Sequence, residues 1–209
     1  MRRIDLSMPL GPGMPTFPGD VAFHAERVRS LANGDPYNLS RLTLGSHSGT
    51  HLDPPLHFLP EGSPVDRLDL DVLNGRCLLV DVPRGRPHIG PEDLPPFPPE
   101  TRRVLFRTAN SARWERGEGF FSDYVALTVT GAEELVRRGI RLVGIDSLSV
   151  ESDPAEQYPV HHLLLGAGVP ILEGLLLEGA PPGVHDLTCL PLRLQDGDGG
   201  PARAILRVE

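Results

Sequence analysis

Four side chains that can bind a metal or carry protons, His47, His51, Asp53 and His57, lie within one eleven-residue segment. The chain has eight histidines among 209 residues, so three of them in one short segment are not expected by chance. Imidazole nitrogen and carboxylate oxygen suit zinc, and also manganese or iron. Two histidines and one aspartate leave a coordination position open, where a bound water can ionise near pH 7. The segment therefore predicts a catalytic metal site.

The residues between these candidates indicate an extended chain and not a helix. Gly49 and the Pro54-Pro55 pair both disfavour helix. In an extended chain the four candidate positions share one parity, so they project to the same side wherever no kink intervenes. Residues 37–44, just before the segment, alternate apolar and polar side chains as a half-buried strand does. We expect a ligand-bearing loop at the end of that strand.

A second candidate group comes much later in the chain, at His161-His162 and Glu173. Glu173 is the only charged residue between positions 169 and 177, in a run that is otherwise apolar or glycine and proline. An ionised carboxylate is costly to bury unless a cation or a metal accompanies it. Taken alone, Glu173 would be an exposed residue of an edge strand. With the first segment present, a second metal ligand is the better interpretation.

The 23 glycines and 23 prolines indicate many turns and few long helices, as in a turn-rich α/β or β-rich protein and not a helical bundle. Neither a repeat nor a linker is evident, so one domain over residues 1–209 is predicted. Besides residues 37–44, strands are expected at residues 3–8, 77–82, 104–107, 141–146, 169–172 and 202–208. Short helices are expected after Gly90 and at residues 131–139 and 161–168.

Composition narrows the classes of function. A formal charge of −8 and an isoelectric point near 5.5 argue against a nucleic-acid partner. All 20 basic residues are arginine, which excludes Schiff-base and lysine-base chemistry. Cys77 and Cys189 are predicted to be buried structural thiols. There is no apolar signal stretch and no run of 18 apolar residues, so we expect a cytoplasmic protein with no membrane partner.

The first segment resembles the signature of the cyclase-like metal-dependent hydrolase family, His-x-Gly-Thr-His-x-Asp-x-Pro-x-His, and every fixed position matches. Similarity to the bacterial kynurenine formamidase branch of this family extends from residues 4–10 to residues 196–204. The resemblance implies a compact α/β domain with a mostly β core and peripheral helices, of the swivelling β/β/α type. It also implies a homodimer or a larger homo-oligomer.

The same resemblance implies a dinuclear metal site in each subunit, with two Zn²⁺ expected and Mn²⁺ as the alternative. The implied ligands are His47, His51, Asp53, His161 and Glu173. Asp53 would reach both metals and Glu173 would bridge them. His161 is preferred to His162 because its twelve-residue distance from Glu173 matches the family pattern. His57 would be the proton donor and acceptor, not a ligand.

The activity implied by the resemblance is hydrolysis of N-formyl-L-kynurenine to L-kynurenine and formate in tryptophan degradation. In this branch a tryptophan usually precedes the Pro-Gly-Asp turn and is thought to contact the aromatic substrate. Here Phe17 occupies that position, so it is the expected substrate-binding residue and keeps an aromatic face without the indole N–H. The alternative substrate is another aryl or cyclic amide that resembles isatin.

Two hypotheses from other functional classes are alternatives to a metal-dependent hydrolase. A serine hydrolase built on Ser48 is disfavoured, because no Gly-x-Ser-x-Gly motif occurs. A non-catalytic metal-binding protein would explain the ligands but not the presence of His57. Loss of activity on chelation, with recovery on adding a divalent metal, would exclude the serine hydrolase.

Overall fold

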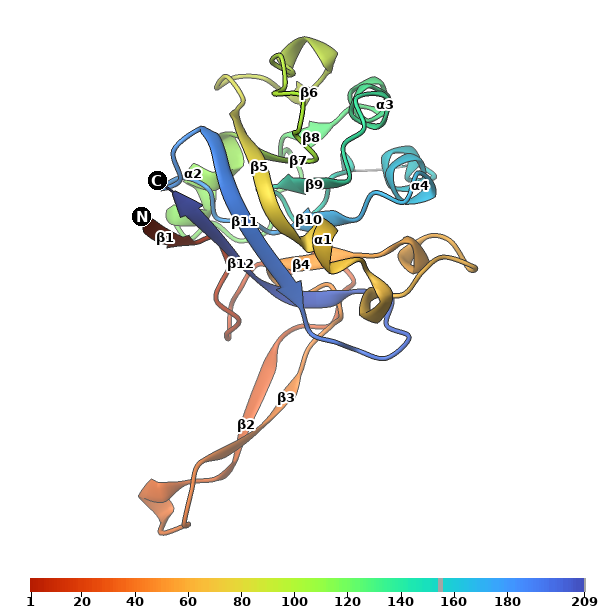
Figure 1. Ribbon diagram of the computed structural model, residues 1–209. Helices are drawn as coiled ribbons and strands as arrows, with labels where there is room; N and C mark the ends of the chain where they lie inside the picture. The colour runs from red at the N-terminus through yellow and green to blue at the C-terminus, as the bar shows by residue number, and fades with distance from the viewer. Residues whose placement is uncertain (154–155, 209) are drawn as a thin grey trace.

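The computed structural model describes residues 1–153 and 156–208. Its largest element is an eight-stranded sheet (Figure 1). The strands of this sheet are β1 (Arg2–Asp5), β4 (His51–Asp53), β5 (Asn74–Asp81), β7 (Arg103–Arg107), β9 (Leu142–Ile145), β10 (Ile171–Glu173), β11 (Gly183–Pro191) and β12 (Gly200–Val208). Their order is β1-β12-β11-β5-β7-β9-β10-β4, and β4 also pairs with β12. All the strands except β1 therefore form a closed, barrel-like ring.

The remaining strands form two small sheets. One pairs β2 (His24–Arg29) with β3 (Leu39–Thr43) and the other pairs β6 (His88–Ile89) with β8 (Ala126–Leu127). The helices are α1 (Leu70–Leu73), α2 (Ala109–Glu115), α3 (Val129–Arg137) and α4 (Pro159–Gly166), with 3-10 turns at Leu31–Asn33, Pro55–His57, Val65–Arg67 and Pro91–Asp93. The Thr128 hydroxyl accepts from the Gly131 N–H and so caps α3 at its start.

Successive side chains of the ring strands point to opposite sides, which gives the protein two apolar layers. Cys77 and Leu79 of β5 pack inside the ring, with Leu105 of β7 and residues of the other ring strands. Leu78 and Val80 face the opposite way, into a core that includes residues of α3 and α4. Because β5, β7 and β9 run parallel and are covered on both faces, they are nearly continuous apolar runs.

The structure confirms the expected fold class, a single domain with a mostly β core and few helices. Each of the expected strands and helices is present, with ends shifted by a few residues. The structure also adds elements that the sequence pattern did not predict, namely β2, β4, β6, β8 and β11 and the helices α1 and α2. The predicted burial of Cys77 and Cys189 is confirmed. Across the described residues, none of the helices combines the length and apolar character that a membrane span requires.

The prediction that residues 37–44 form a half-buried strand was wrong about burial. β3 is exposed along its whole length, because it pairs only with β2 and no other layer covers either face. These two strands form a hairpin arm, residues 21–45, which projects away from the ring (Figure 1). The arm begins just after Asp20 and ends just before the histidine segment, so its base adjoins the candidate site.

Candidate active site

The centre of the site is formed by two neighbouring strands of the ring. His51 and Asp53 lie on β4, two residues apart, so their side chains share one face of the strand. In the antiparallel register Glu173 of β10 is directly opposite His51. Glu173 is only 3% exposed, so the structure contradicts an exposed edge-strand position. β10 lies between β9 and β4, which buries this carboxylate in the sheet.

His47 and His57 reach the same place from the two ends of β4 by different backbone geometry. His47 lies in a turn before the strand, and His57 closes the 3-10 turn that begins at Pro55. Their rings stack with centroids 3.9 Å apart. The expectation of one extended chain therefore holds for His51 and Asp53 only. Gly49, at φ +64°, and the prolines bend the chain on either side and still bring all four side chains together.

His161 enters the site from the first turn of α4, far along the chain from the other histidines. Its Nε2 lies 3.5 Å from Oε1 of Glu173 and 3.8 Å from Oδ2 of Asp53. His162, the next residue, packs its ring edge-on to Phe58 with the centroids 5.3 Å apart. The structure thus brings His161, and not its neighbour, against the two carboxylates.

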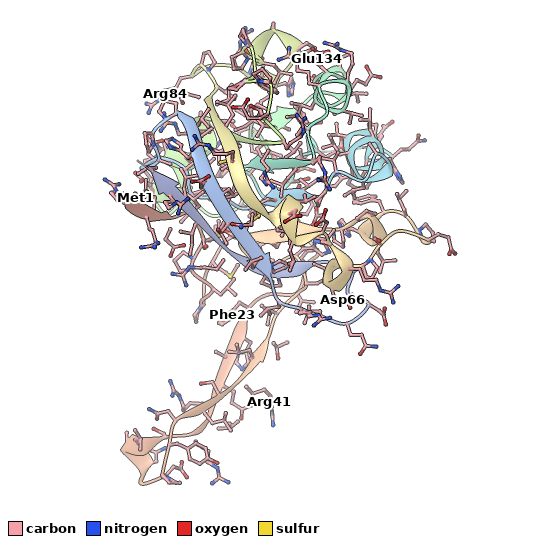
Figure 2. All side chains as sticks on the ribbon, in the orientation of Figure 1. Met1, Phe23, Arg41, Asp66, Arg84 and Glu134 are labelled. Carbon is pink, nitrogen blue, oxygen red and sulfur yellow. The ribbon has the colours of Figure 1, made fainter. Side chains whose placement is uncertain are left out.

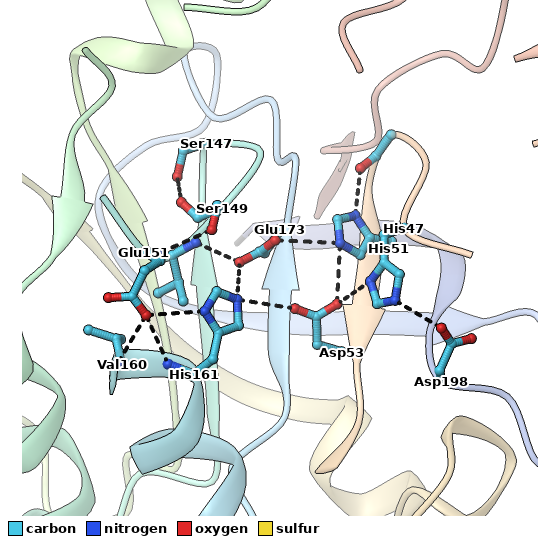
Figure 3. Close-up of polar contacts among 12 residues, drawn as sticks. His47, His51, Asp53, Ser147, Ser149, Glu151, Val160, His161, Glu173 and Asp198 are labelled. Atoms are coloured by element: carbon cyan, nitrogen blue, oxygen red, sulfur yellow. Dashed lines mark hydrogen bonds and ion pairs between the residues drawn. The ribbon is translucent and has the colours of Figure 1, made fainter. Parts of the chain in front are cut away.

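The two carboxylates connect the histidines into one cluster (Figure 3). Oδ1 of Asp53 lies 2.7 Å from Nδ1 of His47 and 3.3 Å from Nε2 of His51. Oε2 of Glu173 lies 3.4 Å from Nε2 of His51. Since the second oxygen of each carboxylate faces His161, both side chains extend from one group of histidines to the other. Each carboxylate can therefore bind a cation together with a histidine on either side.

The charges in the cluster stabilise one another. Burial alone would lower the pKa of His51, but the Asp53 and Glu173 carboxylates hold it well above its ordinary value. Burial likewise opposes protonation of His161, and the Glu151 and Glu173 carboxylates raise its pKa to about 10. Burial would raise the pKa of Asp53, but the neighbouring histidines keep it well below the usual range. The buried site therefore holds anionic carboxylates that need positive charge beside them.

The donor set fits a divalent cation. Among the described residues, two groups could hold a metal ion: His47, Asp53 and His57, and His51, Asp53 and Glu173. Within each group the ligand atoms lie within 4.8 Å of one another. Nε2 of His47 and Oδ2 of Asp53 are buried without a hydrogen-bond partner, which is a cost that a bound cation would remove. His57 therefore lies where it could bind a metal ion, although from the sequence it was expected to donate and accept protons.

The pKa of His57 is lowered, whereas the carboxylates raise the pKa values of the more deeply buried His51 and His161. Burial lowers this pKa, the Asp53 charge opposes the shift, and His47 adds to it. His57 is also less deeply placed and lines the pocket above the cluster. Its imidazole is therefore neutral near pH 7 and can accept a proton there.

A pocket of about 400 Å³ opens onto this cluster. Its walls include Phe17, Phe58, Leu148 and Tyr158, and its lining also contains Asp20. Phe17 meets Phe120 edge-on with the ring centroids 5.3 Å apart, which holds the Phe17 ring in place. The floor is polar and the walls are aromatic or apolar, as expected for a site that takes a small aromatic molecule.

The structure adds site residues that sequence reasoning missed. Nε2 of His47 lies 3.6 Å from an oxygen of Asp198, a residue that precedes Gly199. A Cβ on Gly199 would fall 2.5 Å from the His47 ring, so only glycine permits this approach. Glu151 is buried beside His161 and is considered below. The Gly-rich run around Asp198 was part of the family resemblance, but nothing in its spacing linked it to His47.

Comparisons with known proteins agree with this geometry. The Cyclase family model matches residues 4–152. Kynurenine formamidase from Erythrobacter litoralis (strain HTCC2594) is 39% identical over 207 residues, which cover 99% of this chain and 94% of that protein. A solved structure described as a potential metal-dependent hydrolase with cyclase activity matches with a TM-score of 0.85 at 31% identity, over 98% of this chain and 96% of that chain.

Isatin hydrolase A from Labrenzia aggregata, bound to benzyl benzoate, matches with a TM-score of 0.85 at 24% identity, over 100% of this chain and 94% of that chain. This likeness bears on the fold alone. The family model covers most of the chain, and the curated relative covers nearly all of it. The chain therefore belongs to the Cyclase family of metal-dependent hydrolases, as its signature segment predicted.

Proposed function

We propose that the protein is a kynurenine formamidase, which hydrolyses N-formyl-L-kynurenine to L-kynurenine and formate. The observation that carries this proposal is the joining of a buried histidine–carboxylate cluster to a pocket with aromatic walls. The curated relative at 39% identity carries the same activity in its name. Such a reaction belongs to tryptophan degradation, and we expect it in the cytoplasm.

The proposed cofactor is a pair of Zn²⁺ ions in each subunit, with Mn²⁺ as the alternative. His47, His51 and Asp53 would hold the first ion and His161 and Glu173 the second, with Asp53 and Glu173 shared between the two ions. The contacts of Asp53 support this division, because each of its carboxylate oxygens faces a different set of histidines. When bound, the ions would polarise the formyl carbonyl and make water nucleophilic at neutral pH.

His57 is the proposed proton carrier. Its ring is neutral near pH 7, so it can take a proton from the attacking water. It then delivers that proton to the nitrogen of the departing aryl amine, as the bond between the formyl carbon and this nitrogen breaks. The stack with His47 and the edge contact with Phe58, at centroid distances of 3.9 and 4.5 Å, fix the ring for both transfers.

A steady-state assay tests this function. The metal-replete protein is expected to hydrolyse N-formylkynurenine with a kcat/KM of about 10⁴–10⁸ M⁻¹s⁻¹, the ordinary enzyme range. Formanilide and isatin serve as comparison substrates in the same buffer. Faster turnover of isatin than of N-formylkynurenine would replace the proposed substrate with a cyclic amide. No hydrolysis of any of the three, in protein shown to contain metal, would reject an amidohydrolase.

Phe17 is expected to set the affinity for the aryl ring. Replacing it with alanine removes one wall of the pocket, so kcat/KM for N-formylkynurenine should fall about tenfold, mainly through a higher KM. Phe17→Trp should retain full activity. Phe97→Ala is the matched control, since Phe97 packs under Arg138 and is not part of the pocket lining. Equal kinetics for Phe17→Ala and wild type would remove Phe17 from substrate binding.

We also propose that the protein is a homodimer, or a larger homo-oligomer, held by the hairpin arm. A two-stranded hairpin standing alone is marginally stable in water. The arm nevertheless exposes Leu31, Tyr37, Leu39 and Leu42, and Figure 2 shows it clear of the ring, from Phe23 near its base to beyond Arg41. A second copy of the chain would cover these side chains.

Charge favours a second copy as the partner of the arm. Within residues 21–45 three arginines oppose two acidic residues, which gives the arm a formal charge of +1. The whole chain carries −8, so the rest of it carries −9. The arm is thus the part of one copy that the acidic body of another copy would repel least. Because the arm begins next to Asp20 in the pocket lining, association would also steady one wall of the pocket.

Substitution of Leu39 and Leu42 by serine tests this interface. These side chains are 49% and 56% exposed in the single chain, so the double variant should fold normally. Each loss is worth about 2 kcal/mol of burial, or roughly thirtyfold in the dissociation constant. Sedimentation velocity should show monomer at concentrations where wild type is dimeric. Leu70→Ser, on α1, is the control, and an unchanged mass for the arm variant would contradict the proposal.

A further inference from the structure

Glu151 is a buried carboxylate that the proposed reaction does not use. It is 4% exposed and lies in the segment that connects β9 with α4. One of its oxygens, Oε2, accepts hydrogen bonds from the backbone N–H groups of Val160 and His161, at 3.0 and 3.2 Å. The same oxygen lies 3.3 Å from Nδ1 of His161 (Figure 3). A single buried oxygen thus holds both the backbone and the ring of one proposed metal ligand.

The start of α4 depends on this contact. Tyr158, at the N-cap position, has φ +48° and makes no side-chain cap hydrogen bond. The first N–H groups of a helix need acceptors, and an anion there also meets the positive end of the helix dipole. The Glu151 carboxylate, which lies outside the helix, supplies the acceptor oxygen and also the negative charge. The position of the first turn of α4, and therefore of His161, is set by this carboxylate.

The ring contact decides which nitrogen of His161 faces the site. With Nδ1 directed to Glu151, Nε2 points to Glu173 and Asp53, at 3.5 and 3.8 Å. A carboxylate on the outer nitrogen of a metal-binding histidine fixes its tautomer and makes the inner nitrogen more basic. His51 has a weaker partner, since its Nδ1 lies 2.9 Å from the neutral backbone carbonyl of Gly49.

The same short segment also holds the second carboxylate of this half of the site. The Val150 N–H donates to Oε1 of Glu173 at 2.5 Å. The segment is itself braced, because the Ser149 hydroxyl accepts from the Glu151 N–H at 3.1 Å. Adjacent residues therefore position His161 and Glu173, which come from two different elements.

We propose that Glu151 is a positioning residue for the second metal, acting through His161 and not on the substrate. This inference rests on the two-metal function proposed above. It places the effect of Glu151 on one ion only, because the Glu151 carboxylate contacts His161 and, in the part of the chain that the structure describes, forms no hydrogen bond or ion pair with His47 or His51. If Glu151 only stabilised the fold, replacing it would lower the stability of the protein, and it would change the affinity for both ions or for neither.

The test compares Glu151→Gln with Glu156→Gln, which makes the same charge change at an exposed position shortly before α4. Glutamine keeps an oxygen that can accept from the Val160 and His161 N–H groups, so the fold should persist. Each metal-free protein is titrated with Zn²⁺ by calorimetry, and its melting temperature is measured. Glu151→Gln is expected to bind the second ion about 10- to 100-fold more weakly, and the first ion as wild type does.

Equal affinities for both ions in Glu151→Gln and wild type would overturn the proposal. So would a parallel loss of both ions together with a lower melting temperature of the metal-free protein. An independent readout is the Nδ1–H proton of His161 in ¹H–¹⁵N spectra of metal-free protein. Donation to a carboxylate should place it far downfield, and it should move upfield in Glu151→Gln alone.

The two readouts separate this inference from the proposed function. If wild type binds fewer than two ions, the dinuclear site is rejected and the role of Glu151 toward the second metal is rejected with it. The proton spectrum would then still show whether Glu151 orients the His161 ring. If wild type binds two ions and Glu151→Gln does too, with equal affinity, the function stands and this inference alone fails.

Discussion

His57→Ala protein is expected to retain both metal ions and to hydrolyse N-formylkynurenine about 10²- to 10⁴-fold more slowly, the usual effect of losing a general acid–base. The structure gives this experiment its importance, because His57 places a ring nitrogen within 4.8 Å of the ligand atoms of His47 and Asp53. Proximity alone would also allow it to be a ligand. Metal content and kcat, measured on the same sample, separate the two roles.

The reason to expect a proton carrier lies in the electrostatics of the ring. His51 and His161 are each flanked by two carboxylates that raise their pKa values, whereas burial lowers the pKa of His57. His57 also lines the pocket, where a substrate amine would lie. His162→Ala is the matched control, because this neighbouring histidine is exposed beside the site. Loss of one metal from His57→Ala would make it a ligand, and unchanged turnover would remove it from the mechanism.

Removal of the metal should abolish hydrolysis altogether and lower the melting temperature. The buried carboxylates of Asp53 and Glu173 face histidines on both sides, and Oδ2 of Asp53 has no hydrogen-bond partner of its own. Ions that bind only the folded state stabilise it by about 4 kcal/mol when present at 1,000 times the dissociation constant. A chelator such as EDTA, followed by dialysis, removes this contribution together with the activity.

Differential scanning calorimetry before and after chelation measures the change in melting temperature, and added Zn²⁺ or Mn²⁺ should restore both properties. Ser48→Ala is the control variant, because Ser48 is buried outside the pocket lining and is expected to have no role. It should keep full activity and full sensitivity to the chelator. Activity that survives complete removal of metal, and that is lost in Ser48→Ala, would instead indicate a serine hydrolase.

The order of residues along the chain was enough to predict the chemistry. Histidine and aspartate within one short segment imply a metal whatever the fold, because few other roles need this set of side chains so close together. The segment contains its own bends, at Gly49 and Pro54-Pro55, and the structure shows that its side chains converge even though only His51 and Asp53 lie on a strand. Composition and turn residues indicated only a turn-rich α/β or β-rich protein, and the mostly β core with peripheral helices was implied by the family resemblance.

Only the tertiary structure decided how distant residues complete the site. The pairing of β10 with β4 places Glu173 opposite His51, and a pairing between strands so far apart in sequence leaves no local signal. The approach of Gly199 to His47 and the hold of Glu151 on His161 arise in the same way, from packing. For β3 the local signal was present and the packing was not. Its alternating pattern predicted one buried face, but nothing in the single chain covers the strand. The sequence by itself determined the kind of chemistry, because the histidines and the aspartate lie close together along the chain. Packing between remote segments decided which other residues complete the site and position these side chains.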